Sequence, residues 1–132
     1  DLIVQAVANI TTLVPEVQEH AAHTYAPLLK KTDGLVDWSA PAYAIDRQIR
    51  ALNPWPGTHT HMADQRLKIV VCTPIETHTD AAVGTILNDA GDVACGDGTV
   101  LRVMTVQPDS SRAMPFADAL RGGYVHVGAL LS

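Results

Sequence analysis

Two segments decide the fold of this chain: Asp37-Trp38-Ser39 and Arg47-Gln48-Ile49-Arg50-Ala51-Leu52-Asn53-Pro54-Trp55-Pro56-Gly57. Ser39 can accept hydrogen bonds from the free N–H groups that begin a helix. Apolar residues then recur at helical spacing and should face the core: Ile45, Ile49 and Leu52. The α conformation is disfavoured at Asn53, because a proline follows it, and the two prolines turn the chain around a large aromatic residue. We therefore expect a capped helix that ends where the proline-rich turn begins.

These residues resemble the C-terminal domain of the methionyl-tRNA formyltransferase family. The family pattern is a Tyr-Ala element, a hydrophobic-Asp-Trp-Ser element, Ile-Arg-Ala and then Asn-Pro-Trp-Pro-Gly. Weaker similarity continues to the end of the chain from Thr24, through Arg66-Leu67-Lys68-Ile69, Gly84-Thr85-Ile86, Ala94-Cys95-Gly96-Asp97-Gly98, Val106-Gln107-Pro108 and Phe116-Ala117-Asp118-Ala119-Leu120-Arg121-Gly122. The resemblance implies a mainly β fold with flanking helices, the OB-like formyltransferase C-terminal β-barrel. It also implies a non-catalytic, tRNA-holding half of an enzyme that formylates methionyl-initiator tRNA in translation initiation.

The first third of the chain is expected to lie outside the barrel. Residues 2–14 have helical spacing of apolar side chains, and Pro15 ends that segment. Residues 15–36 contain prolines, histidines and a closing Asp33-Gly34, which are typical of a linker that ends in a turn. We therefore interpret residues 1–34 as the terminal helix of an upstream catalytic domain plus its linker, and residues 35–132 as the C-terminal β-barrel domain.

Short strands and tight turns are expected after the proline-rich turn. Arg66–Cys72 alternates, with Leu67, Ile69 and Val71 on the buried side. Glycine-containing turns favour a barrel or sandwich. The other expected elements are strands at Val83–Leu87, Asp92–Cys95 and Val100–Val106, a helix at Pro115–Arg121 stopped by Gly122-Gly123, and a segment at Tyr124–Val127 that could close the sheet.

Composition suits one domain of 132 residues with a core of its own, since 47% of the residues are apolar. The apolar-rich run Leu2–Val14 carries no charge but is too short and too polar to cross a bilayer. The chain begins at Asp1 with no basic segment before the apolar run, so we expect a piece of a longer cytoplasmic protein with no membrane partner. Cys72 and Cys95 are interpreted as reduced, buried and inert.

No catalysis is expected from this chain alone. The family's catalytic half uses an Asn, a His and an Asp beside a formyl-folate, and none of those motifs occurs here. No glycine-rich phosphate loop or activated nucleophile is recognisable either. We therefore predict no cofactor in this chain, with 10-formyltetrahydrofolate serving the parent enzyme. His59 and His61 would share one face of a strand. One interpretation is a metal site completed by Asp64 or His78, but we favour a polar strand edge.

The net charge of −5 argues against a broadly basic nucleic-acid surface, so any RNA contact must come from local clusters. The candidate contacts are Lys30, Lys31, Arg47, Arg50, Arg66, Lys68 and Arg112. The alternative is that Arg50 pairs with Asp46, Arg47 stacks on Tyr43, and the others are solvated charges. Arg112 is the only basic residue in a loop where the family has several.

The two tryptophans could stack on RNA bases, but we favour both as core anchors beside the helix. The leading function is the tRNA-binding C-terminal domain of methionyl-tRNA formyltransferase, with initiator methionyl-tRNA and the upstream catalytic domain as partners. One alternative is an accessory domain of another formyltransferase or hydrolase that uses 10-formyltetrahydrofolate. Another is a structural module that supports a neighbouring domain or a dimer.

Overall fold

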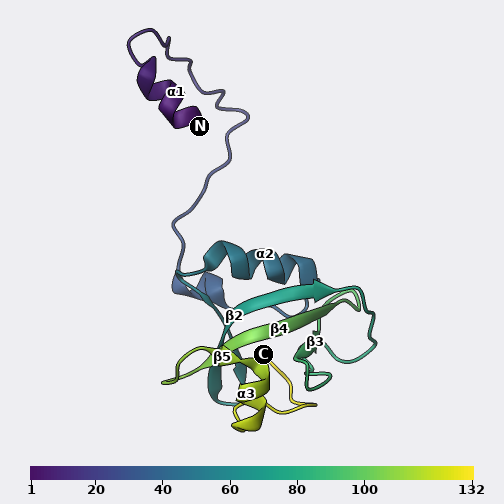
Figure 1. Ribbon diagram of the computed structural model, residues 1–132. Helices are drawn as coiled ribbons and strands as arrows, with labels where there is room; N and C mark the ends of the chain where they lie inside the picture. The colour runs from purple at the N-terminus through teal and green to yellow at the C-terminus, as the bar shows by residue number, and fades with distance from the viewer.

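A curled antiparallel sheet organises the C-terminal hundred or so residues, with one helix across it and another at its far end (Figure 1). The computed structural model describes all residues, 1–132. In chain order the elements are α1 (Leu2–Ala8), the 3₁₀ helix η1 (Lys31–Gly34), α2 (Ala42–Leu52), β1 (Thr58–Met62), β2 (Gln65–Ile75), β3 (Asp92–Ala94), β4 (Val100–Pro108), β5 (Met114–Pro115) and α3 (Phe116–Arg121).

The strands pair in the order β1-β2-β4-β3, all antiparallel, and β5 adds a short pairing to β4. Helix α2 packs on β2, and α3 packs on β4 and β5. The expected fold class, mainly β with flanking helices, is therefore confirmed. A two-residue turn joins β1 to β2 and a five-residue loop joins β3 to β4, whereas the central neighbours β2 and β4 are connected through β3.

Isolated bridges close the sheet into a barrel-like ring. The C-terminal tail bridges β1 through Met62 and Leu131, and it bridges the segment before β3 through Thr85 and Leu130. That segment in turn bridges β3 through Ile86 and Val93. The predicted strand at Val83–Leu87 therefore pairs only through single bridges. The prediction that Tyr124–Val127 closes the sheet was wrong, because those residues turn and the tail that follows them makes the pairing.

Helix α2 buries the face that its apolar spacing predicts: Ala42, Ile45, Ile49 and Leu52. Its N-cap, however, is Pro41, so the prediction that Ser39 caps it was wrong. The Ser39 hydroxyl instead donates to Oδ1 of Asp37 at 2.6 Å. The first helical N–H, that of Ala42, donates to Oγ1 of Thr99 at 2.8 Å. A distant loop thus supplies the acceptor that local sequence cannot.

The two tryptophans have opposite environments. Trp38 is only 4% exposed, and its indole N–H donates to Oγ1 of Thr60 at 2.9 Å. The Thr60 hydroxyl donates in turn to the carbonyl oxygen of Ser132 at 3.0 Å, which ties the tail to the core. Trp55 is 59% exposed on the proline-rich turn, so its prediction as a core anchor was wrong. Trp55 lies on the turn after the last helical residue, Leu52, and so lies outside the buried face of α2.

Strand β2 begins with the predicted alternation and then loses it. Leu67 and Ile69 are buried, but register shifts flank Val71, which is 44% exposed instead of facing the core. The same register resumes from Cys72 onward, so neither strand gains a residue overall, and the irregularity is confined to the pairing around Val71, where the alternation of β2 is interrupted. Cys72 accordingly packs against the core in place of Val71.

Helix α1 is shorter than the predicted segment of residues 2–14. It ends at Ala8, where the Asn9 side chain donates to the carbonyl oxygen of Gln5 at 2.8 Å, and none of its residues is buried. A helix without a packed face gains little beyond its own hydrogen bonds, so a short one is expected. No helix of the structure combines the length and the apolar character that crossing a membrane requires.

The C-terminal helix matches its prediction closely. Helix α3 runs from Phe116 to Arg121 and buries Phe116 and Ala119. Gly123 follows at φ 73°, the left-handed conformation that glycine adopts readily after a helix.

Candidate nucleic-acid interface

The outer face of the β1–β2 hairpin gathers cationic and imidazole side chains. Strand register places His61 opposite Arg66 and His59 opposite Lys68. The alternate β1 residues, Thr58 and Thr60, are buried on the other side. Since side chains alternate across a strand, the four polar residues share the face that points away from the core.

Helix η1 brings a second segment against this face. Leu35 bridges His59 in parallel, and the N–H of Val36 donates to the carbonyl oxygen of His59 at 2.9 Å. The approach requires Gly34, because a Cβ there would collide with the carbonyl oxygen of Gly57. The two segments enclose an open groove of about 330 Å³ lined by Lys31, Thr32, Leu35, His59, His61 and Arg66.

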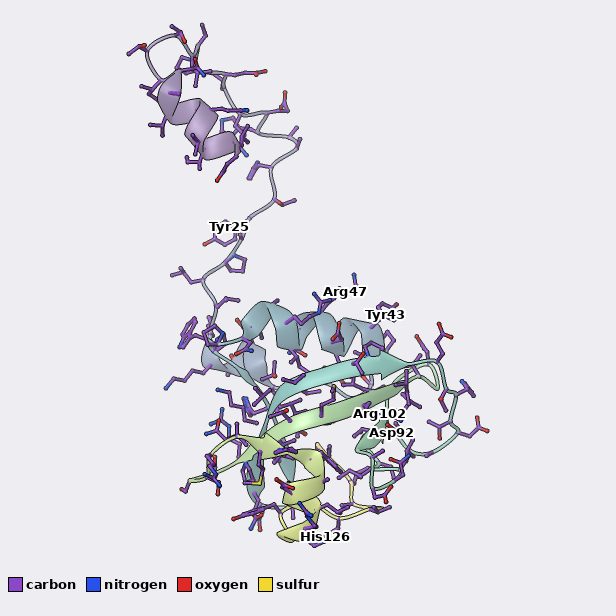
Figure 2. The ribbon with its side chains drawn as sticks, viewed as in Figure 1. Tyr25, Tyr43, Arg47, Asp92, Arg102 and His126 are labelled. Atoms are coloured by element: carbon purple, nitrogen blue, oxygen red, sulfur yellow. The ribbon has the colours of Figure 1, made fainter.

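The groove's cations are free of ion pairs within the chain. The acidic partners of the salt bridges lie elsewhere, since Asp46 pairs with Arg50, Asp92 with Arg102 and Asp118 with Arg121. Figure 2 shows one of these pairs, Asp92 and Arg102, between β3 and β4. Lys31 and Arg66, which line the groove, form no such bridge, and neither does Lys68 on the same hairpin face, so their charges are available to a ligand.

An acidic hollow borders the groove on its far side. Asp64 and Asp109 line it together with Arg66. Arg66 therefore stands between a basic and an acidic surface, and this position limits how far a polyanion could extend past it.

The predicted contacts on α2 are engaged within the helix. The Arg47 guanidinium lies 5.0 Å from the Tyr43 ring centroid, and its Nε donates to the Tyr43 carbonyl oxygen at 3.3 Å. Figure 2 shows both side chains on the side of α2 away from the sheet. Arg50 pairs with Asp46 at 2.9 Å. Neither arginine lines the groove, although 67% of the Arg50 side chain is still exposed.

The two remaining candidates lie on loops. The Lys30 backbone N–H donates to Oδ2 of Asp33 at 2.8 Å, which holds the start of η1 beside the groove. Arg112 is exposed in the loop between β4 and β5 and makes no salt bridge. Of the seven predicted residues, the structure brings Lys31 and Arg66 together in the groove and places Lys68 on the same hairpin face.

Sequence reasoning missed the histidines and Thr32 as members of this cluster. His59 and His61 lie edge to face with ring centroids 5.8 Å apart. Their spacing of two residues predicts a shared strand face, but pairing them with Arg66 and Lys68 required the hairpin register. Residues Ala63-Asp64 form that turn, with Ala63 at φ 52°, and they lack the Asn-Gly or Asp-Gly signal of common two-residue turns.

His59 is partly withdrawn from water and lies close to other cations. Burial lowers the pKa of its imidazole most, and Arg66 and His61 lower it further, while Asp109 opposes them. Its Nδ1 is buried without a hydrogen-bond partner. Nε2 also has no protein partner but is not sealed from solvent, so a ligand oxygen can approach only that atom.

The two thiols and the histidine pair are poorly placed to act as nucleophiles or as metal ligands. Burial raises the pKa of both thiols, Cys72 and Cys95, to about 12, so they are not thiolates near neutrality. No group of three or more metal-ligand side chains comes together, so Asp64 and His78 do not complete a metal shell around the His59–His61 pair. Arg66 and Lys68 beside that pair would also repel a cation.

The geometry defines a class of protein: a small curled-sheet domain that presents an unpaired cationic groove on an outer hairpin face. The chain matches the family described as formyl transferase, C-terminal domain, over residues 28–123, and it belongs to that family.

Curated relatives extend the comparison over nearly the whole chain. It is 49% identical over 132 residues to methionyl-tRNA formyltransferase of Gluconacetobacter diazotrophicus, covering 98% of this chain and 42% of that protein. It is 41% identical over 126 residues to the Marinobacter nauticus enzyme of the same name, covering 92% and 40%. The chain therefore spans about two fifths of the length of these relatives.

A solved structure shows the same fold at low sequence identity. HypX from Aquifex aeolicus, in complex with tetrahydrofolic acid, superposes with a TM-score of 0.61 at 17% identity, covering 95% of this chain and 23% of HypX.

Proposed function

We propose that this chain is the tRNA-binding C-terminal domain of a cytoplasmic methionyl-tRNA formyltransferase. The whole enzyme would formylate methionyl-initiator tRNA for translation initiation, with 10-formyltetrahydrofolate as the formyl donor in an upstream catalytic domain. Residues 1–34 would be the terminal helix of that domain and the linker that follows it. The name shared by relatives at 49% and 41% identity supports the parent activity.

The observation that carries RNA contact is the unpaired cationic groove between η1 and the β1–β2 hairpin. Its charges would contact the phosphate backbone and position the tRNA without reading its bases. Lys31, Arg66 and Lys68 would provide most of the contacts. Lys30, Arg47, Arg50 and Arg112 would provide secondary ones, since two of them are already engaged on α2.

The acidic net charge of −5 favours one alternative. In this alternative, the chain is an accessory or structural domain of another formyltransferase or hydrolase that uses 10-formyltetrahydrofolate. Such a domain does not need to bind a polyanion. Such a domain would not bind tRNA measurably even at low salt.

Initiator tRNA binding at several salt concentrations tests the proposal. Binding to the chain should weaken as salt rises, with log affinity falling by roughly 0.7–0.9 per phosphate contact against log salt. The double variant Lys31→Ala/Arg66→Ala should flatten that slope by roughly 1.4–1.8.

The matched control is Arg47→Ala/Arg50→Ala, which removes the same charge from α2. It should flatten the slope by less than the roughly 0.7–0.9 that one phosphate contact contributes. Absence of binding by the unaltered chain at low salt would contradict the proposal and favour the accessory role. Equal effects of the two double variants would show that net charge, not the groove, determines affinity.

A further inference from the structure

We propose that the groove between η1 and the β1–β2 hairpin, lined by His59 and His61, is a tetrahedral-oxyanion site that His59 makes pH-dependent. Lys31 and Arg66 supply charge, and the imidazoles supply hydrogen-bond donors. Either an RNA phosphodiester or a free phosphate-like anion has the required chemistry. The RNA source rests on the function proposed above, whereas the free anion does not.

The donors of the groove are already arranged before any ligand arrives. Arg66 and His61 are cross-strand partners, and the two imidazoles lie edge to face at 5.8 Å between ring centroids. Thr32 adds a hydroxyl from η1. Charged donors bind oxyanions more strongly than neutral ones, so a guanidinium and an ammonium group that line one groove together with two imidazoles favour an anion.

The burial of Nδ1 determines which ring nitrogen of His59 carries the proton. When the ring is neutral, the buried Nδ1 has no acceptor for a proton, so the proton belongs on Nε2. Nε2 is the atom open to a ligand, and it can therefore donate to an oxyanion even before the ring is charged. An oxyanion would satisfy a donor that the protein leaves unpartnered.

Charges from every neighbouring element determine how the site responds to pH. The groups facing His59 are Lys31 from η1, His61 on β1, Arg66 and Lys68 on β2, and Asp109 after β4. Burial and then Arg66 and His61 hold the pKa of His59 below its usual range, so the free site is mainly uncharged at His59 near neutrality.

A bound anion reverses part of this effect. It offsets the repulsion from Arg66 and favours the imidazolium form, so binding takes up part of a proton, at the buried Nδ1 that has no acceptor in the protein. Affinity must then rise as pH falls, by at most about tenfold per pH unit for each proton taken up. A metal ion would show the opposite pH dependence, because it needs neutral imidazoles.

The experiment uses the complete chain and two anion probes at constant ionic strength. Sulfate is the free-anion probe, because its charge is constant between pH 5.5 and 8, and imidazole NMR signals report its binding. Initiator tRNA is the phosphodiester probe. Affinity for at least one probe should rise several-fold between pH 8 and pH 6, and the pKa of His59 should rise when the probe is bound.

The variant His59→Gln/His61→Gln keeps donors but cannot be charged, so its affinity should be nearly independent of pH. The matched control is His20→Gln/His23→Gln, which removes another edge-to-face pair from the exposed N-terminal segment. The control should retain the pH dependence. Arg66→Gln, at an exposed position, gives a second test, because it should raise the pKa of free His59 and weaken anion binding.

The outcomes separate this inference from the proposed function. Sulfate binding with no tRNA binding supports a free-anion site and overturns the RNA role. tRNA binding with the same pH dependence in His59→Gln/His61→Gln overturns the imidazole site and leaves the RNA role intact. Unchanged imidazole signals with both probes overturn the inference altogether.

Discussion

At the scale of single residues, the two tryptophans differ in what their rings contact. Trp38 is buried and donates to Thr60, whereas Trp55 is mostly exposed. Trp38→Ala should reduce the free energy of unfolding by roughly 3–5 kcal/mol, because it removes a buried ring and a hydrogen bond. Trp55→Ala should cost roughly 1 kcal/mol or less. Urea unfolding of both variants checks this, and a loss at Trp55 as large as at Trp38 would contradict it.

Residue identity alone does not distinguish these two environments. Both tryptophans lie beside the same predicted helix, and large aromatics are buried more often than not. The difference arises from the path of the chain. Trp38 precedes α2 and reaches Thr60 of β1, whereas Trp55 follows α2 on the proline-rich turn, after the last buried residue of the helix, Leu52.

At the scale of elements, helix α2 begins with help from a loop that is distant in sequence. Thr99 Oγ1 accepts from the N–H of Ala42 and donates to the carbonyl oxygen of Gly96 at 2.7 Å. Thr99→Val keeps the shape but removes the acceptor, and it should cost roughly 0.5–2 kcal/mol in unfolding free energy. Ser39→Ala should change it by less than about 0.5 kcal/mol, since its hydroxyl serves only an exposed turn. Thermal unfolding distinguishes this from capping by Ser39, which would reverse the two effects.

Local patterns predicted these elements better than they predicted the contacts between them. The apolar face of α2, the start of β2 and the glycine stop after α3 all follow from spacing and turn chemistry. The irregular pairing at Val71 does not, because it depends on how the partner strand β4 pairs with β2. The hairpin that joins His61 to Arg66 was missed for a similar reason, since its turn carries no glycine.

At the scale of the whole molecule, the ring of strands closes through the C-terminal tail. The N–H of His61 donates to the carbonyl oxygen of Ser132 at 2.7 Å, and the N–H of Ser132 returns a bond at 2.9 Å. Closure depends on contacts between residues that are far apart in the sequence, such as His61 and Ser132, so no short stretch of sequence predicts it. The same is true of the predicted basic residues. Only the folded structure shows that some of them line the groove and others lie on α2.

Residues 1–29 are separate from this ring. No hydrogen bond joins them to the rest of the chain, and α1 is exposed on all sides, with Ile3 and Val7 each 65% exposed. Figure 1 shows α1 far from the sheet, at the end of an extended segment. An exposed apolar helix face of this kind is typical of a surface that another domain covers.

Removing residues 1–29 should therefore leave the free energy of unfolding within about 0.5 kcal/mol of that of the full chain, because no buried contact is lost. It should also reduce self-association, because the exposed apolar side chains of α1 are gone. Denaturant unfolding measures the first effect and analytical ultracentrifugation the second. The matched control is the full chain with Ile3→Ser/Val7→Ser, which should reduce self-association equally without shortening the chain. A loss of more than about 1 kcal/mol on truncation would mean that this segment packs on the barrel, and it would contradict its assignment to an upstream domain.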